Sequence, residues 1–380
     1  SVNEKPQPVF IIDYENIDNN DFLIVNQMKY HGTNRNSIPD IVVYVNGLPL
    51  SVIEAKSPKV SIADAISDLS YYQENSPKLF YYNQICVGIN KAKALYGTIG
   101  SQFAHYSKYR LDDTSKLEEL LEKTPTAQDS LIYALFRKDK LLDIIRNFTI
   151  FEIEQGRTIK KLPRYQQLRA VNKILHRLQT ENKGGVVWHT QGSGKSITMV
   201  YLATKLRREE AGFDNPTILV VTDRVDLDNQ ISSTFRRTGF VNPIQAVSIS
   251  NLKELLKDSY GKTLMTTIHK FQEKAEESQK EVEILSNKSN IFVLIDEAHR
   301  SQYGLTAAYM RNSLPNAKFI AFTGTPIDKE EKSTLRTFYG GGEYIDKYTI
   351  KQSVEDGNTL AIRYQTGMPE YFIEKDLMNE

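Results

Sequence analysis

Apolar and polar residues alternate along the first hundred residues in the way that β-strands require. The stretch Asp40–Glu54 holds two apolar runs on either side of Asn46-Gly47. Asn-Gly between such runs is a strong hairpin signal, because both turn residues need positive φ. Ser61 to Gln73 then has helical spacing, with four apolar residues on one face: Ile62, Ala65, Ile66 and Leu69. With Leu79 to Ile89 as a further buried strand, the pattern predicts a strand–strand–helix–strand unit.

The next part of the chain changes from helical spacing to a basic segment. Leu117 to Phe148 carries apolar residues at helical intervals. Gln155 to Thr180 contains seven Lys or Arg residues and no Asp or Glu. Two interpretations stay open: a solvated helix face with a linker, or a surface along which duplex DNA passes, attracted through its phosphates at Lys160 and Lys161. We expect the domain boundary near the start of this segment.

From Gly184 onward, short apolar runs alternate with helical segments. Five runs have the length and composition of buried strands: 185–188, 218–221, 264–265, 291–295 and 319–322. Strands separated by helices predict a doubly wound parallel sheet that binds ligands at the carboxyl ends of its strands. We therefore expect an α/β protein with domains at 1–150 and 151–345, and a linker or incomplete further domain at 346–380.

Composition narrows the class of protein only a little. The 380 residues include 48 Lys+Arg and 47 Asp+Glu, a net charge of +1, which argues against a simple basic DNA-coating protein. Cys86 is the only cysteine, so no disulfide can form within the chain, and a lone thiol fits a reducing compartment such as the cytoplasm. No apolar run of about 18 residues supports a membrane-spanning segment.

A candidate phosphate loop runs from His189 to Ser196. It fits the pattern G-x-x-x-x-G-K-[ST] at every position but the first, where His189 replaces Gly. Backbone N–H groups of the loop would surround ATP phosphates, Lys195 would reach the β- and γ-phosphates, and Ser196 would hold Mg²⁺. The other loop residues predicted to contact the nucleotide are Thr190, Gly192, Ser193 and Gly194.

An acidic pair follows the predicted strand 291–295. Asp296 suits Mg²⁺ binding, and Glu297 suits polarising the water that attacks the γ-phosphate. Both the strand and the phosphate loop should end at the same edge of the sheet.

These residues resemble superfamily 2 helicases and translocases. The resemblance rests on the phosphate loop, on Asp296-Glu-Ala-His299 and on Thr323-Gly-Thr-Pro326. It implies that Gln167 reads adenine and that Thr323 and Thr325 couple the nucleotide state to movement. It also implies that a nucleic-acid strand contacts three residues: Arg224, Thr267 and Lys270. Helix capping or simple solvation would also explain Thr and Lys at strand ends.

A second candidate site lies in the N-terminal part. Alternation along a strand sends Glu54 and Lys56 to one face, and Asp40 begins the partner strand. Two carboxylates would bind Mg²⁺, and Lys56 would place a positive charge beside a scissile phosphate. The spacing resembles the PD-(D/E)xK nucleases, although a salt bridge on an edge strand would also explain it. In that family a helix carries Gln-x-x-x-Tyr; Tyr72 matches, whereas Asp68 replaces Gln.

The order of the parts resembles the restriction subunit of type I restriction-modification enzymes. The resemblance implies an ATP-dependent translocase on double-stranded DNA and a Mg²⁺-dependent endonuclease, which works with modification and specificity subunits and cuts away from the recognition site. Two alternatives remain: a superfamily 2 helicase or remodelling ATPase with a non-catalytic N-terminal module, and a nucleotide-gated assembly module. No Gln-x-x-Gly-Arg-x-x-Arg-like segment follows Pro326, so we expect a chain truncated at its C-terminus, and the start at Ser1 rather than Met indicates truncation at the N-terminus too. We expect such a chain to bind ATP weakly, to hydrolyse it slowly if at all, and not to translocate.

Overall fold

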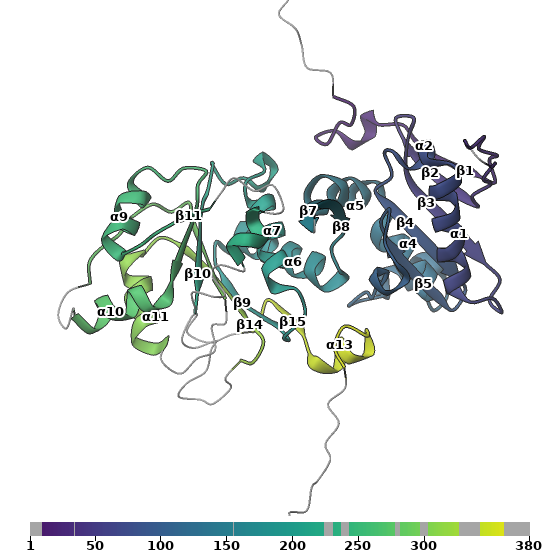
Figure 1. The fold of residues 1–380 in the computed structure, drawn as a ribbon. Coiled ribbons are helices and arrows are strands. Elements are labelled where there is room, and N and C mark those ends of the chain that lie inside the picture. The colour runs from purple at the N-terminus through teal and green to yellow at the C-terminus, as the bar shows by residue number, and fades with distance from the viewer. Residues whose placement is uncertain are drawn as a thin grey trace, which may run out of the picture.

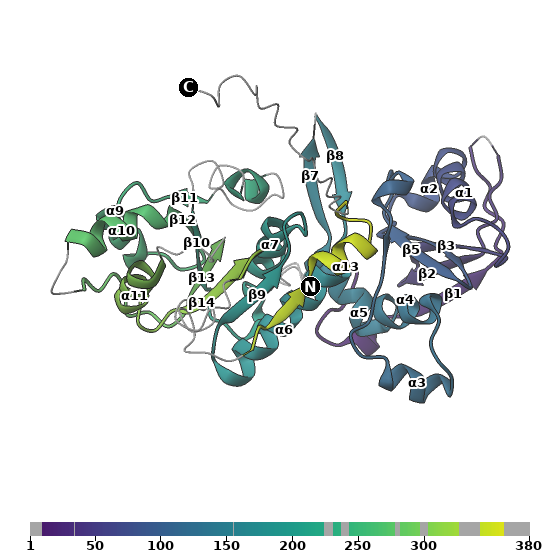
Figure 2. The ribbon, with the colours of Figure 1, turned by 90° about the horizontal axis from the view of Figure 1, so that it is seen from below.

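The protein is described by a computed structural model for residues 10–33, 35–154, 156–223, 231–236, 243–277, 282–296, 303–326 and 343–360. Two sheet-based units lie side by side (Figure 1). We call residues 10–148 the N-terminal unit and residues 165–360 the parallel-sheet unit. A β-hairpin, residues 150–161, lies between them in the chain and stands out between the two units in Figure 2.

The N-terminal unit is built on a mixed sheet. Within the described residues its strands are β1 (Phe22–Asn26), β2 (Ile41–Val45), β3 (Leu48–Lys56), β4 (Ile85–Asn90), β5 (Lys93–Gly97) and β6 (Ser107–Lys108), in that spatial order. Only the β3–β4 pair in this sheet, as described, is parallel, and the other neighbours are antiparallel. Helix α1 (Ile62–Asn75) connects the two parallel strands, as such a crossover requires.

The predicted hairpin and helix are both present. Asn46 and Gly47 have φ values of 50° and 79°, and β2 and β3 pair antiparallel around them. Ser61 caps α1 by accepting a hydrogen bond from the Ala63 N–H, and the buried face of the helix consists of the four predicted residues. The predicted strand from Leu79 to Ile89 is wrong in its first half. Pro77 begins the short helix α2 (Pro77–Phe80), because proline suits the first turn of a helix, and β4 starts only at Ile85.

Short helices and the hairpin complete the first half of the chain. The helices are α3 (Ser115–Leu121), α4 (Ala127–Leu135) and α5 (Lys138–Asp143), and α5 runs into a π-helical turn at Ile144–Phe148. The hairpin strands are β7 (Ile150–Glu154) and β8 (Arg157–Lys161). The helical spacing predicted for 117–148 is therefore confirmed, and the basic segment begins in a strand.

The parallel-sheet unit starts with helix α6 (Tyr165–Glu181). Its sheet, as far as it is described, has the order β11-β12-β10-β13-β14-β9-β15, and every neighbouring pair is parallel. The strands are β9 (Gly185–His189), β10 (Thr217–Thr222), β11 (Ile244–Gln245), β12 (Thr263–Thr267), β13 (Ile291–Asp296), β14 (Lys318–Thr323) and β15 (Asp346–Tyr348). The helices are α7 (Lys195–Leu206), α9 (Ile249–Lys257), α10 (Ile268–Glu277), α11 (Tyr303–Ser313) and α13 (Ile350–Glu355).

All five predicted strands of this sheet are confirmed, and their carboxyl ends meet at one edge. Both faces of this parallel sheet are buried, so side chains on either face of a strand are apolar. This explains why the strands appear in the sequence as continuous apolar runs. Along β10, Ile218 and Val220 belong to one buried cluster, whereas Leu219 and Val221 belong to another. The segment from 346 onward begins with β15, which pairs with β9.

The two units share one apolar core. A single cluster of buried side chains includes Val43 and Leu50 of the N-terminal sheet as well as Val187 and Met199 next to the phosphate loop. Apolar side chains of the two units are therefore buried together. Among the described residues, no helix is long and apolar enough to cross a membrane.

Candidate functional sites

The predicted nuclease carboxylates meet where β2 begins and β3 ends. Asp40 Oδ2 accepts a hydrogen bond of 2.8 Å from the Ala55 N–H, and the Asp40 N–H lies 3.5 Å from Glu54 Oε2. Glu54 is buried, with 3% of its surface exposed. Burial, and secondarily the nearby charge of Asp40, raise the pKa of Glu54 above its usual value.

Lys56 lies between two carboxylates. Its Nζ is 2.7 Å from Glu54 Oε1 and 2.5 Å from Asp68 Oδ2 of α1. Although burial opposes it, hydrogen bonds to Asp68 and Glu54 raise the pKa of Lys56, so the ammonium stays charged at neutral pH. Sequence reasoning treated Asp68 only as a departure from a family pattern, and did not predict that it would contact Lys56.

Helix α1 also brings Tyr72 to this cluster. Its hydroxyl donates a long hydrogen bond, 3.4 Å, to the Ile38 carbonyl. Burial, followed by the charges of Glu54 and Asp68, raises the pKa of Tyr72, so the phenol remains neutral. The structure thus brings together the four residues predicted to carry nuclease chemistry: Asp40, Glu54, Lys56 and Tyr72.

The donor set of this cluster fits a hard divalent cation. Asp40 and Glu54 offer carboxylate oxygens close together, and their mutual repulsion would be relieved by a cation between them. Among the described residues, no group of three or more His, Cys, Asp or Glu side chains is arranged to hold a metal ion. Mg²⁺ is commonly bound through one or two carboxylates plus water, so two protein ligands suffice.

The phosphate loop lies between β9 and α7. Gly192 and Gly194 have φ values of 78° and 86°, a left-handed conformation that favours glycine. His189 ends β9 and is not among the residues with positive φ, so no glycine is needed at the first position of the loop. The loop is held in place by hydrogen bonds from the Ser193 N–H to the Thr190 carbonyl, 3.2 Å, and from the Thr190 N–H to the Tyr348 carbonyl, 2.9 Å.

The adjacent residues Gln166 and Gln167 of α6 differ in their hydrogen bonds. Gln167 Nε2 donates to the Gly194 carbonyl at 3.1 Å, and its Oε1 accepts from the Arg164 N–H at 2.8 Å. Gln167 therefore braces the phosphate loop, while its predicted role in reading adenine stays a prediction. Gln166 is fully buried, and within the described structure its amide has no hydrogen-bond partner.

The strand-end residues gather beside the loop. Asp296 ends β13, and Thr323 ends the adjacent strand β14; both are buried. Lys195 lies against Gly324, since a methyl group placed on that glycine would be 3.3 Å from Lys195 Nζ. Ser196 is half-buried in the first turn of α7, and Thr325 is exposed. Glu297 and Arg224 lie outside the described residues.

Several residues predicted to contact nucleic acid are engaged within the protein. Lys160 Nζ donates to the Asn83 carbonyl and to Gln84 Oε1, and burial lowers its pKa. Lys161 forms an ion pair with Glu152, and Lys270 Nζ donates to the Ala246 carbonyl. Thr267 is buried at the end of β12. Lys160 thus joins the hairpin to the N-terminal unit, a role that neither interpretation of the basic segment includes.

A cavity of about 830 Å³ separates the hairpin from the phosphate loop. Its walls come from three parts of the chain: residues 96–102 of the N-terminal unit, residues 157–162 of the hairpin, and residues 192–194 of the loop. Gln167, Ile197 and Tyr201 are also among the residues that line it. The cavity is large enough for a nucleoside and opens beside the residues expected to bind phosphates.

Two sequence families match the chain. The SWI2/SNF2 ATPase family matches residues 166–380, and the N terminus of the type I restriction enzyme R protein matches residues 1–105. The endonuclease subunit of the type I restriction enzyme HindI from Haemophilus influenzae is 38% identical over 98% of this chain and 37% of its own length. A Methanocaldococcus jannaschii chain assigned as the endonuclease subunit of the type I enzyme MjaIXP is 32% identical, over 99% of this chain and 38% of its own length.

Among solved structures, the SWI2/SNF2 ATPase core of Sulfolobus solfataricus in complex with double-stranded DNA is similar at a TM-score of 0.34 and 18% identity, over 46% of this chain and 35% of that one. The present chain spans somewhat over a third of the length of the two curated relatives. The R-protein match contains the carboxylate cluster, and the SWI2/SNF2 match contains the phosphate loop. The chain therefore belongs to the SWI2/SNF2 ATPase family, and the region ahead of that match is similar to the N terminus of the type I restriction enzyme R protein.

Proposed function

We propose that the protein is the subunit of a type I restriction enzyme that translocates double-stranded DNA at the expense of ATP and cuts it with Mg²⁺ as cofactor, away from the recognition site. One observation carries this proposal. A cluster of Asp40, Glu54 and Lys56 and a phosphate loop at the edge of a parallel sheet occur in one chain and share one apolar core. A motor and a nuclease in one chain can act on the same DNA in sequence.

In the motor, each residue has a role that follows from its place. The N–H groups of the loop from Thr190 to Gly194, at the amino end of α7, would surround the phosphates of ATP. Lys195 would neutralise the β- and γ-phosphates, and Ser196 and Asp296 would hold Mg²⁺ between them. Glu297 would orient the attacking water. Thr323 and Thr325, next to Lys195 through Gly324, would report the state of the γ-phosphate.

The nucleoside end of ATP would occupy the neighbouring cavity. Gln167, which lines this cavity, supports the loop and is the predicted adenine contact. DNA contacts are proposed for Arg224, Thr267 and Lys270, and for the hairpin at Lys160 and Lys161.

In the nuclease, Asp40 and Glu54 would hold Mg²⁺, which would stabilise negative charge on the scissile phosphate and lower the pKa of a bound water. Lys56 would place its ammonium against the same phosphate. Tyr72, neutral and adjacent, could donate a hydrogen bond to a phosphate oxygen. Glu54 is buried and its pKa is raised, so a bound metal ion, in addition to the ammonium of Lys56, would favour its ionised form.

We infer the partners from the resemblance to type I restriction enzymes. Recognition of the target and of its methylation would lie in the modification and specificity subunits of the same complex. We place the protein in the cytoplasm, where its single cysteine, the buried Cys86, would stay reduced.

The test is cleavage of a long unmethylated DNA by the complete restriction complex carrying wild-type, E54A or K195A subunit. We expect E54A to hydrolyse ATP without cutting, and K195A to do neither. If E54A still cuts, the nuclease assignment is wrong; if K195A cuts without ATP, the coupling of cleavage to the motor is wrong. If D40A leaves every activity intact, the N-terminal unit is a non-catalytic module.

A further inference from the structure

A buried carboxylate lies next to the start of the phosphate loop. Asp346, the first residue of β15, is 3% exposed and has three partners. His189 Nε2 lies 2.8 Å from its Oδ2, Arg169 Nε 2.8 Å from its Oδ1, and Lys173 Nζ 3.0 Å from its Oδ1. The Arg169 and Lys173 side chains come from α6, one helical turn apart, so both reach the same side of the helix.

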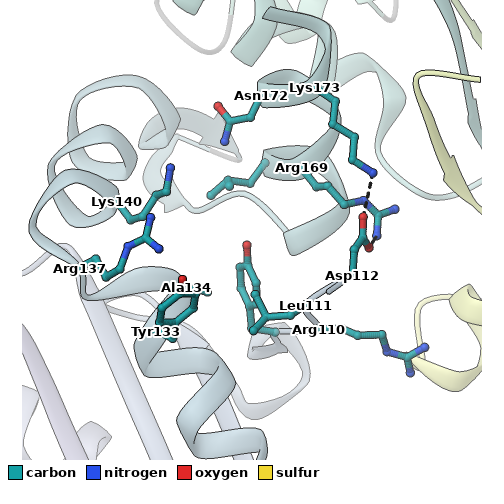
Figure 3. A pocket seen from close by; sticks show the side chains of 12 residues that line it. Arg110, Leu111, Asp112, Tyr133, Ala134, Arg137, Lys140, Arg169, Asn172 and Lys173 are labelled. Carbon is teal, nitrogen blue, oxygen red and sulfur yellow. Dashed lines mark hydrogen bonds and ion pairs between the residues drawn. The ribbon is translucent and has the colours of Figure 1, made fainter. Parts of the chain in front are cut away.

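The same two cations bind a second carboxylate, in the N-terminal unit. Lys173 Nζ lies 2.8 Å from Asp112 Oδ2, and Arg169 also forms an ion pair with Asp112. Figure 3 shows Arg169 and Lys173 meeting Asp112 at one end of a pocket of about 250 Å³ between the two units. Two carboxylates and two cations thus balance each other, and only Asp346 also contacts His189.

His189 takes part in this network as a neutral ring. It is completely buried, and burial lowers its pKa despite the neighbouring Asp346. Although burial alone would raise it, the hydrogen bond from His189 and the charge of Arg169 lower the pKa of Asp346, which therefore stays ionised. A neutral imidazole next to a carboxylate carries its proton on the nitrogen that faces it, so Nε2 donates the bond.

The bond joins the two strands that fix the beginning of the loop. His189 is the last residue of β9, and β15 is the neighbouring strand, with Tyr348 opposite His189 in the ladder. The next residue, Thr190, is held to β15 as well, through its N–H and the Tyr348 carbonyl. The loop thus starts from a point that is held by one backbone bond and one side-chain bond to β15.

We propose that His189 and Asp346 are positioning residues for ATP binding: the bond from His189 to Asp346 fixes where the phosphate loop begins, and Arg169 and Lys173 hold Asp346 in place. The inference rests on the proposed ATPase function. Neither residue touches the reacting atoms. Losing the bond should let the loop shift and weaken nucleotide binding more than it slows the chemical step.

The test measures KM and kcat for DNA-stimulated ATP hydrolysis by the complete complex with variants of His189. H189M keeps the size of the side chain but cannot donate, whereas H189Q keeps an N–H near the position of Nε2. We expect H189M to raise KM for ATP about tenfold with little change in kcat, and H189Q to restore KM to within about threefold of wild type. Unchanged KM in H189M, or equal KM in the two variants, would overturn the inference.

Two further variants separate the hydrogen bond from other effects. D112N removes a carboxylate from the same two cations without touching His189, so KM should stay at the wild-type value; a rise as large as that of H189M would show that the charge balance matters instead. The single variants H189M and D346A remove the same hydrogen bond. In the double variant H189M/D346A, KM for ATP should therefore be no higher than in whichever single variant has the higher KM. If the fold-increases in KM of the two single variants multiply in the double variant, the two residues act independently and the inference is wrong.

The K195A variant distinguishes a failure of the positioning role of His189 from a failure of the proposed ATPase function. K195A in the same assay should abolish ATP hydrolysis. If K195A hydrolyses ATP like wild type, the motor assignment fails, whatever the His189 variants do. If K195A is inactive and H189M is unaffected, only the positioning role fails. Thermal unfolding of each variant confirms that the compared proteins are folded.

Discussion

The ammonium of Lys56 lies 2.5 Å from Asp68 Oδ2, so helix α1 supplies a carboxylate to a cluster that otherwise lies on the ends of two strands. Lys56 is also paired with Glu54 on its own strand. A lysine held from both sides has little freedom to swing away from the place where a phosphate would bind. The helix therefore helps to orient the cation, although Asp68 is not the glutamine that relatives are expected to carry there.

We predict that D68A slows DNA cleavage by about tenfold to a hundredfold, because small displacements of a catalytic group cost about that much. ATP hydrolysis should not change. D68Q, which retains a hydrogen-bond acceptor at this position, should cleave faster than D68A. The matched control is D64A, since Asp64 is exposed on the first turn of the same helix. Cleavage by D68A at the rate of D64A would show that Lys56 needs no support from α1.

A second prediction concerns the buried charge of Glu54. Its pKa is raised in the folded protein by burial and by Asp40, so folding favours the protonated form. The carboxyl group therefore contributes stability below its unfolded pKa and loses that contribution as the pH rises through the folded pKa. E54Q stays neutral, and Asp68 still neutralises Lys56. We expect E54Q without metal to melt at a higher temperature than wild type at pH 8, with a difference that shrinks toward acid pH.

The same variant tests metal binding without any cleavage assay. Adding Mg²⁺ should raise the melting temperature of wild type more than that of E54Q, because a ligand stabilises only the state that binds it. Cleavage by E54Q should fall by at least about a hundredfold. Equal responses of the two proteins to Mg²⁺ would show that Glu54 does not hold the metal.

Much of this arrangement could be predicted from local sequence. The Asn46-Gly47 turn, the buried face of α1 and the parallel strands follow from periodicity and turn chemistry, and these are properties of neighbouring residues. Alternation along β3 likewise places Lys56 beside Glu54. The carbonyl contact that buries Lys160 depends instead on how the hairpin packs on a distant turn, which no local pattern records.

Other contacts between residues far apart in the sequence could not be predicted either, because no local pattern indicates them. His189 and Asp346 are 157 positions apart, and nothing in the spacing of either residue indicates the other. The apolar surroundings of Leu79 predict a strand, but Pro77 favours a helical turn there. Periodicity identifies which residues face the core, whereas pairing between polar side chains depends on the tertiary fold.

A third prediction concerns Gly194, whose φ is +86°. A methyl group there would lie 2.4 Å from Gln167 Nε2, so G194A would displace the side chain that braces the loop. Gly212 offers a matched control: its φ is +76°, and a methyl group there would meet nothing within 4 Å. Both variants should lose about 1–2 kcal/mol of stability through backbone strain.

Only G194A should raise KM for ATP, by about tenfold or more, since only there does the strain reach the phosphate loop. Nucleotide titration and thermal unfolding of the two variants separate the effects. An equal KM in G194A and G212A would show that the bond from Gln167 to the Gly194 carbonyl does not support nucleotide binding.

The last prediction concerns Asp356, which holds the two units together. Its side chain is 3% exposed, accepts hydrogen bonds from the Tyr165 hydroxyl at 2.7 Å and the Tyr348 hydroxyl at 3.0 Å, and forms ion pairs with Lys108 and Arg110 of the N-terminal unit. D356A would leave the hydroxyls of two buried tyrosines without this acceptor and two cations without this carboxylate. We expect a loss of about 2–4 kcal/mol in the free energy of unfolding. D258A is the control, because Asp258 forms an exposed pair with Lys262 and should cost less than about 0.5 kcal/mol. Urea unfolding of both variants measures the difference, and equal values would mean that Asp356 contributes no more than a surface charge.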